Sequence, residues 1–598
     1  MCGIIGYNGK GKTLNILIDG LKALEYRGYD SSGIAYKLNG KFNIVKSIGK
    51  INELEKKVNF DLNPNIGIGH TRWATHGKVS EANSHPHHVQ KIILVHNGII
   101  ENYLEIKDFL KNEGYQFYSE TDTEVACALI DYFYQKTNDI KKSLKEFINK
   151  VAGSYALGIM VEDSNNLYAL RKSSPLIVAK NKDGFFIASD TVAITNYANE
   201  ILYLDEEEIA EISNTDIKVF DKNLKKVKTK FSKIDKSINF VDKAGFNHYM
   251  LKEIHEEPKI VKELFDYYFE DGIDSLIKKM PDFTKYSKID IVACGSAYHT
   301  GLVGKSLLEK YANIPVNVEI ASEYRYKKNF YHENTLVIVV SQSGETADTL
   351  AALRMANKDG IDTLAIVNTE NSSIDREAKM SILTKAGKEI AVATTKAYSA
   401  QVLIFILIAL NISFKRKLIS ENEINKIIKD IKKMPVLIEN TINKNDYKKV
   451  ASSIYKRNDI FYIGRQVDYA IAMEGSLKLK EISYINSAAY AAGELKHGTI
   501  SLVENGTPVI GVLTDKNIME KTISNIEEVK SRGAFTVVIS NENIENDFNY
   551  KIVVPKVHEF LEPLLIIIPL QLIAYEIASL RKCDIDKPKN LAKSVTVE

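Results

Sequence analysis

The second half of the chain carries one pattern twice, and this repeat constrains the fold more than any other feature. From about residue 285 onward, short apolar strands alternate with long helices, which is typical of a doubly wound parallel sheet. Residues 335–367 align without a gap with residues 508–540, strand on strand. Gly360 falls on Gly533 in this alignment. We therefore predict two sister α/β domains that follow one another along the chain.

Residues 1 to about 235 follow a different pattern. Short β-type runs such as GIIGY, IGIGHTRW and KIILVHNG stand with helical segments such as TDTEVACALIDYFYQK between and after them. This arrangement predicts an α+β domain with antiparallel sheet. The charged and aromatic stretch NHYMLKEIHEEP that follows is interpreted as a linker entering a helix.

The composition excludes several classes of protein. The 598 residues include 79 basic and 77 acidic side chains, interleaved along the chain, which argues against a nucleic-acid or membrane-surface protein. The apolar stretches VLIFILIAL and LLIIIPLQLIAYEIASL are expected to be buried helices rather than membrane spans, and no secretory signal is expected. The cysteines are far apart and favour a reducing cytoplasm; they are Cys2, Cys127, Cys294 and Cys583.

Cys2 stands directly behind the initiator methionine. If the methionine is removed, the thiol gains its own α-amino group as a neighbour. That amine has a pKa of about 7.7 to 8.0, so it can take the thiol proton near neutral pH. The alternative is that Cys2 is a small residue at the start of a buried strand.

Two polar segments favour the catalytic interpretation of Cys2. In HTRWATHG, the Arg72 fork suits a substrate carboxylate, and Thr75 and His76 can add hydrogen bonds. In VHNGIIEN, Asn97 stands beside Gly98 after a strand. A side-chain amide beside a glycine N–H is the arrangement that an oxyanion hole requires.

A third segment, SETDTEV, places Asp122 at a predicted helix start, where an ordinary capping role is the alternative.

Together CGIIGY, EYRGYDSSG, HTRWATHG, SHPH, VHNGIIEN and SETDTE resemble the N-terminal-nucleophile glutamine amidotransferases, and most closely the glucosamine-6-phosphate synthase family. The resemblance implies a four-layer αββα fold. It implies these roles: Cys2 as nucleophile, Asn97 and Gly98 as oxyanion donors, Arg72, Thr75, His76 and Asp122 as glutamine ligands, and Trp73 as the gate for ammonia.

The segment LVIVVSQSGETADTLAAL runs from strand through a tight turn into a helix. Its neutral donors suit a phosphate, whereas a simple helix cap explains only one or two of them; they are Ser341, Gln342, Ser343 and Thr346. The Walker lysine and a dinucleotide glycine pattern are both missing, so a phosphorylated small molecule is favoured. The region resembles the sugar-isomerase (SIS) domain. That resemblance adds Ser296 to the phosphate site, while Ala297 stands where these synthases usually have a serine.

Glu474, Lys478 and Glu481 in EGSLKLKEISYINSAAYAAGELKHG share one helix face. A surface ion-pair ladder is the alternative, but the small apolar residues that follow favour a packed site. By resemblance, Lys478 belongs to the sugar-phosphate site and Glu481 moves a proton between C1 and C2 of the sugar. His497 opens the sugar ring from the neighbouring subunit of a homodimer.

The C-terminal tail DKPKNLAKSVTVE would ordinarily be expected to fray. By resemblance it is an ordered arm, and Lys593 forms a Schiff base with the open-chain ketose. Lys589 stands where an arginine is common, so a bidentate contact there is lost.

The resemblance covers essentially the whole chain. It implies these segments: a glutaminase domain at 2–235, a linker and entry helix at 236–280, SIS domains of three-layer α/β/α fold with parallel sheets at 281–425 and 445–588, and the tail at 589–598. The implied reaction converts fructose 6-phosphate and glutamine to glucosamine 6-phosphate and glutamate, the first step of the hexosamine pathway, with internal ammonia transfer and no metal or organic cofactor. Alternatives are an amidotransferase with another acceptor and a sugar-phosphate-binding regulator.

Overall fold

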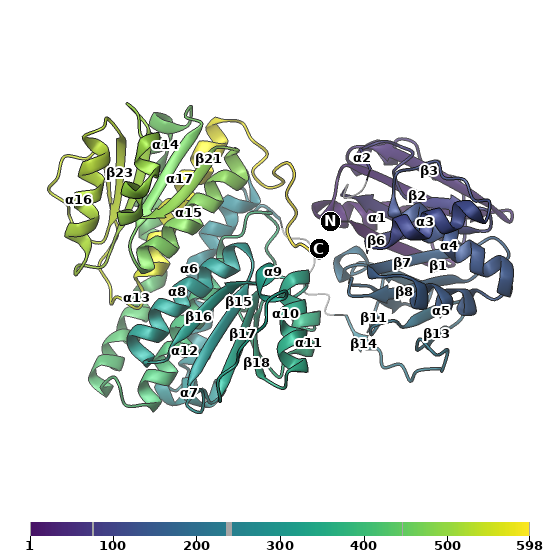
Figure 1. Ribbon diagram of the computed structural model, residues 1–598, viewed down its shortest axis with the longest axis horizontal. Coiled ribbons are helices and arrows are strands. Elements are labelled where there is room, and N and C mark those ends of the chain that lie inside the picture. Colours follow the sequence, from purple (N-terminus) through teal and green to yellow (C-terminus); the bar gives the residue numbers. More distant parts are fainter. Residues whose placement is uncertain (1, 74–76, 235–241, 445, 597–598) are drawn as a thin grey trace. The chain divides into compact units, whose positions relative to one another are not determined.

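The computed structural model describes residues 2–73, 77–234, 242–444 and 446–596 (Figure 1). The chain divides into two compact units. Unit 1 comprises Met1–Val241 together with Ser594–Glu598, and unit 2 comprises Asp242–Lys593.

Two antiparallel sheets form the middle of unit 1. The first has the strand order β14-β11-β9-β10-β1-β4-β2-β3 and the second the order β13-β12-β8-β7-β6-β5. The strands of the first sheet are β1 Gly3–Gly9, β2 Ser31–Leu38, β3 Lys41–Ile48, β4 Ile66–Arg72, β9 Ile177–Lys180, β10 Gly184–Ala188, β11 Glu200–Tyr203 and β14 Ser232–Lys233. Those of the second are β5 His87–Val89, β6 Ile92–Ile100, β7 Gly153–Val161, β8 Leu167–Lys172, β12 Ile209–Ile212 and β13 Ile217–Phe220.

Helices cover the outer face of each sheet in unit 1 (Figure 1). They are α1 Thr13–Leu24, α2 Ile51–Glu55, α3 Tyr103–Asn112, α4 Asp122–Thr137 and α5 Ile140–Lys150. Side chains of α1 and α2 pack on the first sheet, and those of α3, α4 and α5 pack on the second. A third apolar cluster, which includes Ile4, Ile68 and Val95, fills the space between the sheets. This layering confirms the predicted αββα fold.

Unit 2 contains two parallel five-stranded sheets with the same topology. The first has the order β16-β15-β17-β18-β19 and the second the order β21-β20-β22-β23-β24. The strands are β15 Lys288–Ala293, β16 Val316–Ile320, β17 Thr335–Ser341, β18 Asp362–Val367, β19 Met380–Leu383, β20 Asp459–Gly464, β21 Asn486–Ala491, β22 Pro508–Leu513, β23 Phe535–Ser540 and β24 Tyr550–Val553. The shared order confirms the repeat that the sequence predicted.

Helices lie on both faces of each parallel sheet. They are α6 Tyr249–Tyr268, α7 Ile273–Lys279, α8 Gly295–Ala312, α9 Ala321–Tyr324, α10 Ala347–Lys358, α11 Ser373–Glu377, α12 Lys396–Lys415, α13 Glu421–Lys444, α14 Tyr447–Ile454, α15 Val467–Ser483, α16 Met519–Lys530 and α17 Glu562–Leu580. One apolar cluster joins the inner faces of both sheets through α8, α12, α15 and α17. The two halves of unit 2, each built on one parallel sheet, therefore share a single core.

Two helices in the described part of unit 2, α12 and α17, are long and apolar enough to cross a membrane by length and composition alone. Most of the apolar window of each is buried in the protein, 94% for α12 and 83% for α17. Both are therefore core helices, as the sequence predicted.

The segment expected to be a linker that enters a helix contains the start of α6. Helix α6 begins at Tyr249, continues through Pro258 and buries Met250, Glu253 and Glu257 against the core of unit 2. Pro258 lies in the middle of α6, where a proline removes one helical hydrogen bond and crowds the preceding turn. The packed apolar face of α6 outweighs that loss.

Glu257 on α6 is a fully buried carboxyl group. Its Oε2 accepts a hydrogen bond of 2.5 Å from the hydroxyl of Ser399 on α12. Burial raises the pKa of Glu257 to about 8. Glu257 is therefore mainly protonated at neutral pH, and the core avoids an uncompensated charge.

Replacing Glu257 with glutamine is expected to stabilise the protein above neutral pH. The pKa of this carboxyl is about 8 in the folded chain and about 4.3 in the unfolded chain. Because the folded-state pKa is the higher one, the carboxyl contributes stability that is fully present below about pH 4.3 and is lost as the pH rises to about 8. The difference in thermal unfolding midpoint, Glu257→Gln minus wild type, should therefore increase as the pH rises between these two pKa values. At higher pH the difference should stay constant.

The neighbouring Glu256 provides a control. Burial raises the pKa of its carboxyl, but Lys252 and Lys396 outweigh burial and hold it below its ordinary value. Glu256→Gln should lower the unfolding midpoint by a constant amount over the same range. Parallel curves for wild type and Glu257→Gln would contradict the assignment of a neutral Glu257.

Candidate active sites

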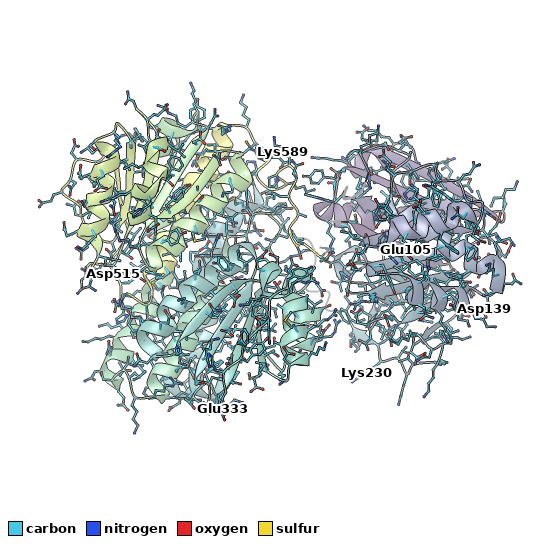
Figure 2. All side chains as sticks on the ribbon, viewed as in Figure 1. Glu105, Asp139, Lys230, Glu333, Asp515 and Lys589 are labelled. Carbon is cyan, nitrogen blue, oxygen red and sulfur yellow. The ribbon has the colours of Figure 1, made fainter. Side chains whose placement is uncertain are left out.

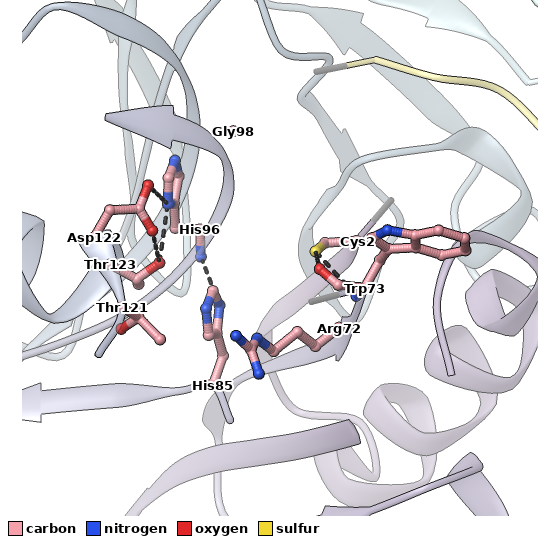
Figure 3. Close-up of a pocket in the computed structure, with 9 residues that line it drawn as sticks. All are labelled: Cys2, Arg72, Trp73, His85, His96, Gly98, Thr121, Asp122 and Thr123. Carbon is pink, nitrogen blue, oxygen red and sulfur yellow. Dashed lines mark hydrogen bonds and ion pairs between the residues drawn. The ribbon is translucent and has the colours of Figure 1, made fainter. Parts of the chain in front are cut away.

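A pocket in unit 1 collects residues from five segments of the chain (Figure 3). They come from the start of β1, the end of β4, the loop before β5, strand β6 and the start of α4. The lining residues are Cys2, Arg72, Trp73, His85, His96, Gly98, Thr121, Asp122 and Thr123. Most of the predicted glutamine-site residues therefore meet in one place. Thr75 and His76 lie outside the described residues.

The thiol of Cys2 lies against the backbone of Trp73. The N–H of Trp73 is 3.3 Å from Cys2 Sγ, and Sγ is 3.4 Å from the Trp73 carbonyl oxygen (Figure 3). Burial raises the pKa of the Cys2 thiol, while the Trp73 N–H and the Arg72 charge act in the opposite direction. The thiol therefore needs a base to become the reactive thiolate.

The orientation of the Asn97 side chain is fixed by His70. His70 Nε2 lies 3.0 Å from the carbonyl oxygen of His96 and 3.1 Å from Asn97 Oδ1. A carbonyl can only accept, so Nε2 carries the proton and the oxygen of Asn97 faces it. The Asn97 amide nitrogen consequently faces Cys2 and donates 3.0 Å to the Cys2 carbonyl oxygen.

The position after Asn97 admits only glycine. Gly98 has φ +138°, and a Cβ there would lie 2.1 Å from the carbonyl oxygen of Ser154. Glycine therefore lets β6 approach β7 and places the Gly98 backbone at the pocket.

Arg72 and Asp122 supply opposite charges to the same pocket. The Arg72 guanidinium donates 3.2 Å to the carbonyl oxygen of Gly77, and burial lowers its pKa. Asp122 Oδ2 accepts 2.9 Å from the N–H of Ile100. The helix cap of α4 is Thr121, whose hydroxyl accepts from the Glu124 N–H, so Asp122 is not the capping residue.

In unit 2, polar residues gather where the strand order of the first parallel sheet reverses. Strands β15 and β17 run in parallel side by side, with Ala293 opposite Val340. The loops that follow them therefore lie at the same edge, which is where open α/β sheets bind ligands. Helices α8 and α10 begin there without a side-chain cap, which leaves their N–H donors available.

The loop after β17 is held by its own hydroxyls. Ser341 Oγ lies 2.9 Å from Thr346 Oγ1 and accepts 3.0 Å from the Gly344 N–H. Gly344 has φ +66°, and a Cβ there would lie 1.9 Å from Ser372 Oγ. Ser343 Oγ accepts 3.2 Å from the Glu345 N–H, and Gln342 lies in the same turn. The four predicted donors therefore surround one turn.

Glu474, Lys478 and Glu481 line a buried face of α15. Lys478 Nζ lies 3.4 Å from Glu474 Oε1 and 2.5 Å from Glu481 Oε2. Ser296 donates 2.8 Å to Glu474 Oε1 and accepts 3.1 Å from Lys478 Nζ. The interpretation as a surface ladder is therefore wrong, and this network joins the first SIS half to the second.

The pKa of each of these three side chains is shifted by one or both of the others. Burial lowers the pKa of Lys478, but its two glutamates outweigh burial and raise it. Burial raises the pKa of Glu474, but Lys478, His299 and Ser296 outweigh burial and hold it below its ordinary value. Burial and the neighbouring Glu474 leave the pKa of Glu481 raised. Glu481 is thus the carboxyl that exchanges a proton more easily.

The C-terminal tail is held to unit 2 at three points. The carboxylate of Asp586 accepts from the N–H groups of Tyr249 and Met250 and so caps α6. The Lys589 N–H donates 2.8 Å to Tyr484 Oη, and Lys589 Nζ lies 4.5 Å from the centre of that ring. Figure 2 labels Lys589. The ammonium of Lys593 is hydrogen-bonded to Glu389.

Sequence reasoning missed Glu389, His299 and Tyr484. Their only sequence signals are weak, such as the position of Glu389 before the helix start ATTKA. His497 is exposed on the 3₁₀ helix η4, Ala492–His497. Within the part of the chain that the structure describes, no hydrogen bond or ion pair joins it to Glu481. Within the described residues, no group of three or more His, Cys, Asp or Glu side chains is arranged to hold a metal ion.

Two family descriptions match the chain. The SIS domain matches residues 282–411 and again 453–581, and the glutamine amidotransferase domain matches residues 70–196.

Curated relatives match over the full length of both chains. The chain is 47% identical to the glutamine–fructose-6-phosphate aminotransferase (isomerizing) of Caldanaerobacter subterraneus subsp. tengcongensis, and 46% identical to that of Clostridium tetani, with 100% of each chain covered. Among solved structures, the C-terminal domain of glucosamine-fructose-6-phosphate aminotransferase from Francisella tularensis matches with a TM-score of 0.55 and 36% identity. That match covers 58% of this chain and 100% of the other.

Tyr484 is expected to protect the tail from proteolysis. Tyr484→Ala removes both the hydrogen bond and the ring that hold Lys589, so trypsin should cut after Lys589 several-fold faster and release residues 590–598. Tyr484→Phe keeps the ring and should give an intermediate rate. Cleavage can be followed by intact mass during brief digestion. Equal rates in all three proteins would show that Tyr484 does not hold the tail.

Proposed function

Because the chain belongs to the family of isomerizing glutamine–fructose-6-phosphate aminotransferases, we propose that it makes glucosamine 6-phosphate and glutamate from fructose 6-phosphate and glutamine. The observation that carries this proposal is the full-length identity of 47% to a member of that family. The two sites described above supply a thiol in one unit and a lysine in the other, as the two half-reactions require.

Glutamine is hydrolysed in unit 1. Once Met1 is removed, the α-amine of Cys2 takes the thiol proton, and Sγ attacks the carbonyl carbon of the glutamine side-chain amide. The C–N bond breaks, ammonia leaves with that proton, and water then hydrolyses the thioester to glutamate. The raised pKa of the Cys2 thiol supports the need for this adjacent base.

The residues around Cys2 bind glutamine and stabilise the oxyanion that forms during the reaction. Asn97 Nδ2 and the Gly98 N–H hold the oxyanion, and the orientation that His70 imposes on Asn97 supports that role. Arg72 binds the α-carboxylate of glutamine, Asp122 binds its α-amino group, and Thr75 and His76 line the pocket. Trp73, in backbone contact with Cys2, gates the passage of ammonia.

Fructose 6-phosphate binds in unit 2. The donors of the phosphate loop, together with Ser296 and Lys478, hold the sugar phosphate; the loop donors are Ser341, Gln342, Ser343 and Thr346. Two helix N-termini that lack side-chain caps support phosphate binding at this edge. Ala297 offers no hydroxyl, so the backbone donors carry more of the phosphate charge.

Lys593 and two acid–base groups carry the sugar chemistry. The Lys593 amine condenses with the C2 carbonyl of the open-chain ketose and releases water, and ammonia then displaces the lysine. Glu481 removes a proton from C1 and returns it at C2, which the raised pKa of this carboxyl supports. The substrates and these residues need no metal or organic cofactor.

His497 opens the sugar ring from the neighbouring subunit of a homodimer. The exposure of His497 in the single chain supports a role across an interface. We place the enzyme in the cytoplasm, where a reducing environment keeps the Cys2 thiol free. The four cysteines are unpaired in the structure.

A product assay with glutamine and fructose 6-phosphate tests the proposal. Wild type should form glucosamine 6-phosphate. Cys2→Ala should lose glutamine-dependent synthesis but keep sugar isomerisation, and Lys593→Ala should lose synthesis but keep glutamine hydrolysis, because each removes one of two separate nucleophiles. Absence of glucosamine 6-phosphate with wild type would contradict the proposed reaction.

Mixing two inactive variants tests the role of His497. His497→Ala and Lys593→Ala should each be inactive in synthesis alone. After the subunits exchange, a mixed dimer has one site with an intact Lys593 and an intact His497, so about one quarter of wild-type activity should return. No recovery despite mass evidence of mixed dimers would show that His497 acts within its own subunit.

A further inference from the structure

Glu389 is a fully buried carboxylate in the segment between β19 and α12, and the reaction described above assigns it no role. Its side chain is 0% exposed. Oε1 accepts from the N–H groups of Thr395, at 2.9 Å, and Ala397, at 3.1 Å. Oε2 accepts 2.6 Å from the Thr394 hydroxyl and also pairs with the Lys593 ammonium. Both oxygens of the buried carboxylate therefore accept hydrogen bonds, and one of the donors is the Lys593 ammonium.

Helix α12 stabilises the negative charge of Glu389. Thr395 is the N-cap residue of α12, so the carboxylate lies at the positive end of the helix dipole. Burial raises the pKa of Glu389, but Lys593 and the hydroxyl and N–H donors outweigh burial and hold it below its ordinary value. The carboxylate thus stays charged inside the protein.

A second buried carboxyl, Glu253 on α6, lies beside the first. Glu253 Oε1 accepts from the N–H of Ile390, at 2.5 Å, and from the N–H of Ala391, at 3.3 Å. Burial and the Glu389 charge raise the pKa of Glu253 to about 8. One of the two carboxyls is therefore charged near neutral pH, and it is the one that touches Lys593.

We propose that Glu389 is the counterion of the Lys593 nitrogen throughout the sugar reaction, pairing first with the ammonium and then with the protonated imine. This inference rests on the proposed function of Lys593. Glu389 contacts the reacting nitrogen directly, whereas Glu253 is hydrogen-bonded to backbone N–H groups of the segment that carries Glu389.

The charge balance of the reaction favours a permanent counterion. The ammonium and the C2 ketone give a protonated imine and one water: the C–N bond forms, the C–O bond breaks, and the single positive charge remains on nitrogen. Ammonia then adds to C2, the C–N bond to Lys593 breaks, and the lysine leaves as an ammonium while the sugar keeps a neutral imine. Protons pass through water within each step, and the net charge facing Glu389 does not change.

Without Glu389, the buried positive charge on the Lys593 nitrogen would be unfavourable. Removing one member of a buried ion pair is strongly destabilising, because the other charge remains without compensation. The imine would then lose its proton, and a neutral imine is a poorer acceptor for ammonia. An opposite charge at contact distance shifts a pKa by about 1–3 units.

Four other charged or titratable groups face this pair. Glu253 and Glu257 come from α6, Lys396 from α12 and Glu481 from α15. Lys396 pairs with Glu256 at 2.7 Å, and Glu481 pairs with Lys478 at 2.5 Å. Lys396 and Glu481 are thus each paired with another residue, and Glu389 is the carboxylate that pairs with the Lys593 nitrogen.

Sodium cyanoborohydride provides the test, because it reduces protonated imines far faster than neutral ones. Full-length enzyme would be incubated with fructose 6-phosphate and this reagent, and labelling of Lys593 would be followed by peptide mass. Wild type should be labelled at neutral pH. Glu389→Gln should be labelled about 10- to 1000-fold more slowly, and its labelling should recover about tenfold for each unit that the pH is lowered.

Glu253→Gln is the matched control. It replaces a neighbouring buried carboxyl that is already neutral, so labelling should stay within about twofold of wild type. Glutamine hydrolysis in unit 1 should be unchanged in both variants, which shows that the chain has folded. For Glu389→Gln, kcat for synthesis should fall with the labelling rate while KM for fructose 6-phosphate stays within a few-fold.

Glu389→Asp covers the case in which the glutamine variant does not fold. It keeps the charge but withdraws it by one methylene, so the pH at which labelling declines should shift downward from the wild-type value. Wild-type labelling in Glu389→Gln, a deficit that does not recover at lower pH, or an unshifted Glu389→Asp profile would overturn the counterion role. Wild type without any label at Lys593 would instead refute the imine itself, and with it the proposed role of Lys593.

Discussion

The buried ion pairs of Lys478 are the interaction on which unit 2 most depends. Lys478 lies between Glu474 and Glu481 on α15, and Glu474 also binds Ser296 and His299 from α8. The network around this lysine therefore connects helix α8 of the first SIS half to helix α15 of the second. Without it, two buried carboxylates would face each other, at a cost of about 3–5 kcal/mol. The same pairing leaves Glu481 as the carboxyl that is easiest to protonate.

Burial and partner choice set the charge of each acid in the protein. Glu257 and Glu253 lie in the core near hydroxyl or N–H donors and have raised pKa values. Glu389, in the same core, has the Lys593 ammonium and a helix N-terminus as partners, and its pKa is lowered. A similar rule applies in unit 1, where burial raises the pKa of the Cys2 thiol and so calls for an adjacent base.

Motifs with strong local patterns could be predicted from the sequence. The strand–loop–helix repeat predicted both parallel sheets, and the segments around Cys2, Arg72 and Asn97 predicted one site. Cys2 precedes β1 and Arg72 ends β4, whereas Asn97 lies inside β6 and not after a strand as expected. Residues that act through tertiary contacts could not be predicted. Tyr484 and Glu389 are single polar residues without a distinctive neighbourhood, and their partners lie about one hundred or more positions away. The helix that follows the linker was expected from the sequence, but its polar, Pro-containing sequence did not show which face of α6 packs on the core.

Nitrogen tracing tests the central claim, that one chain hydrolyses glutamine and uses the released ammonia on a sugar phosphate. The enzyme would be given glutamine labelled with ¹⁵N in the side-chain amide, fructose 6-phosphate and an excess of unlabelled ammonium. The mass of the product would then be measured. The account predicts glucosamine 6-phosphate that carries ¹⁵N with little dilution, because the ammonia does not mix with solvent. Product with the isotope content of the bulk ammonium, or no glucosamine 6-phosphate, would contradict it.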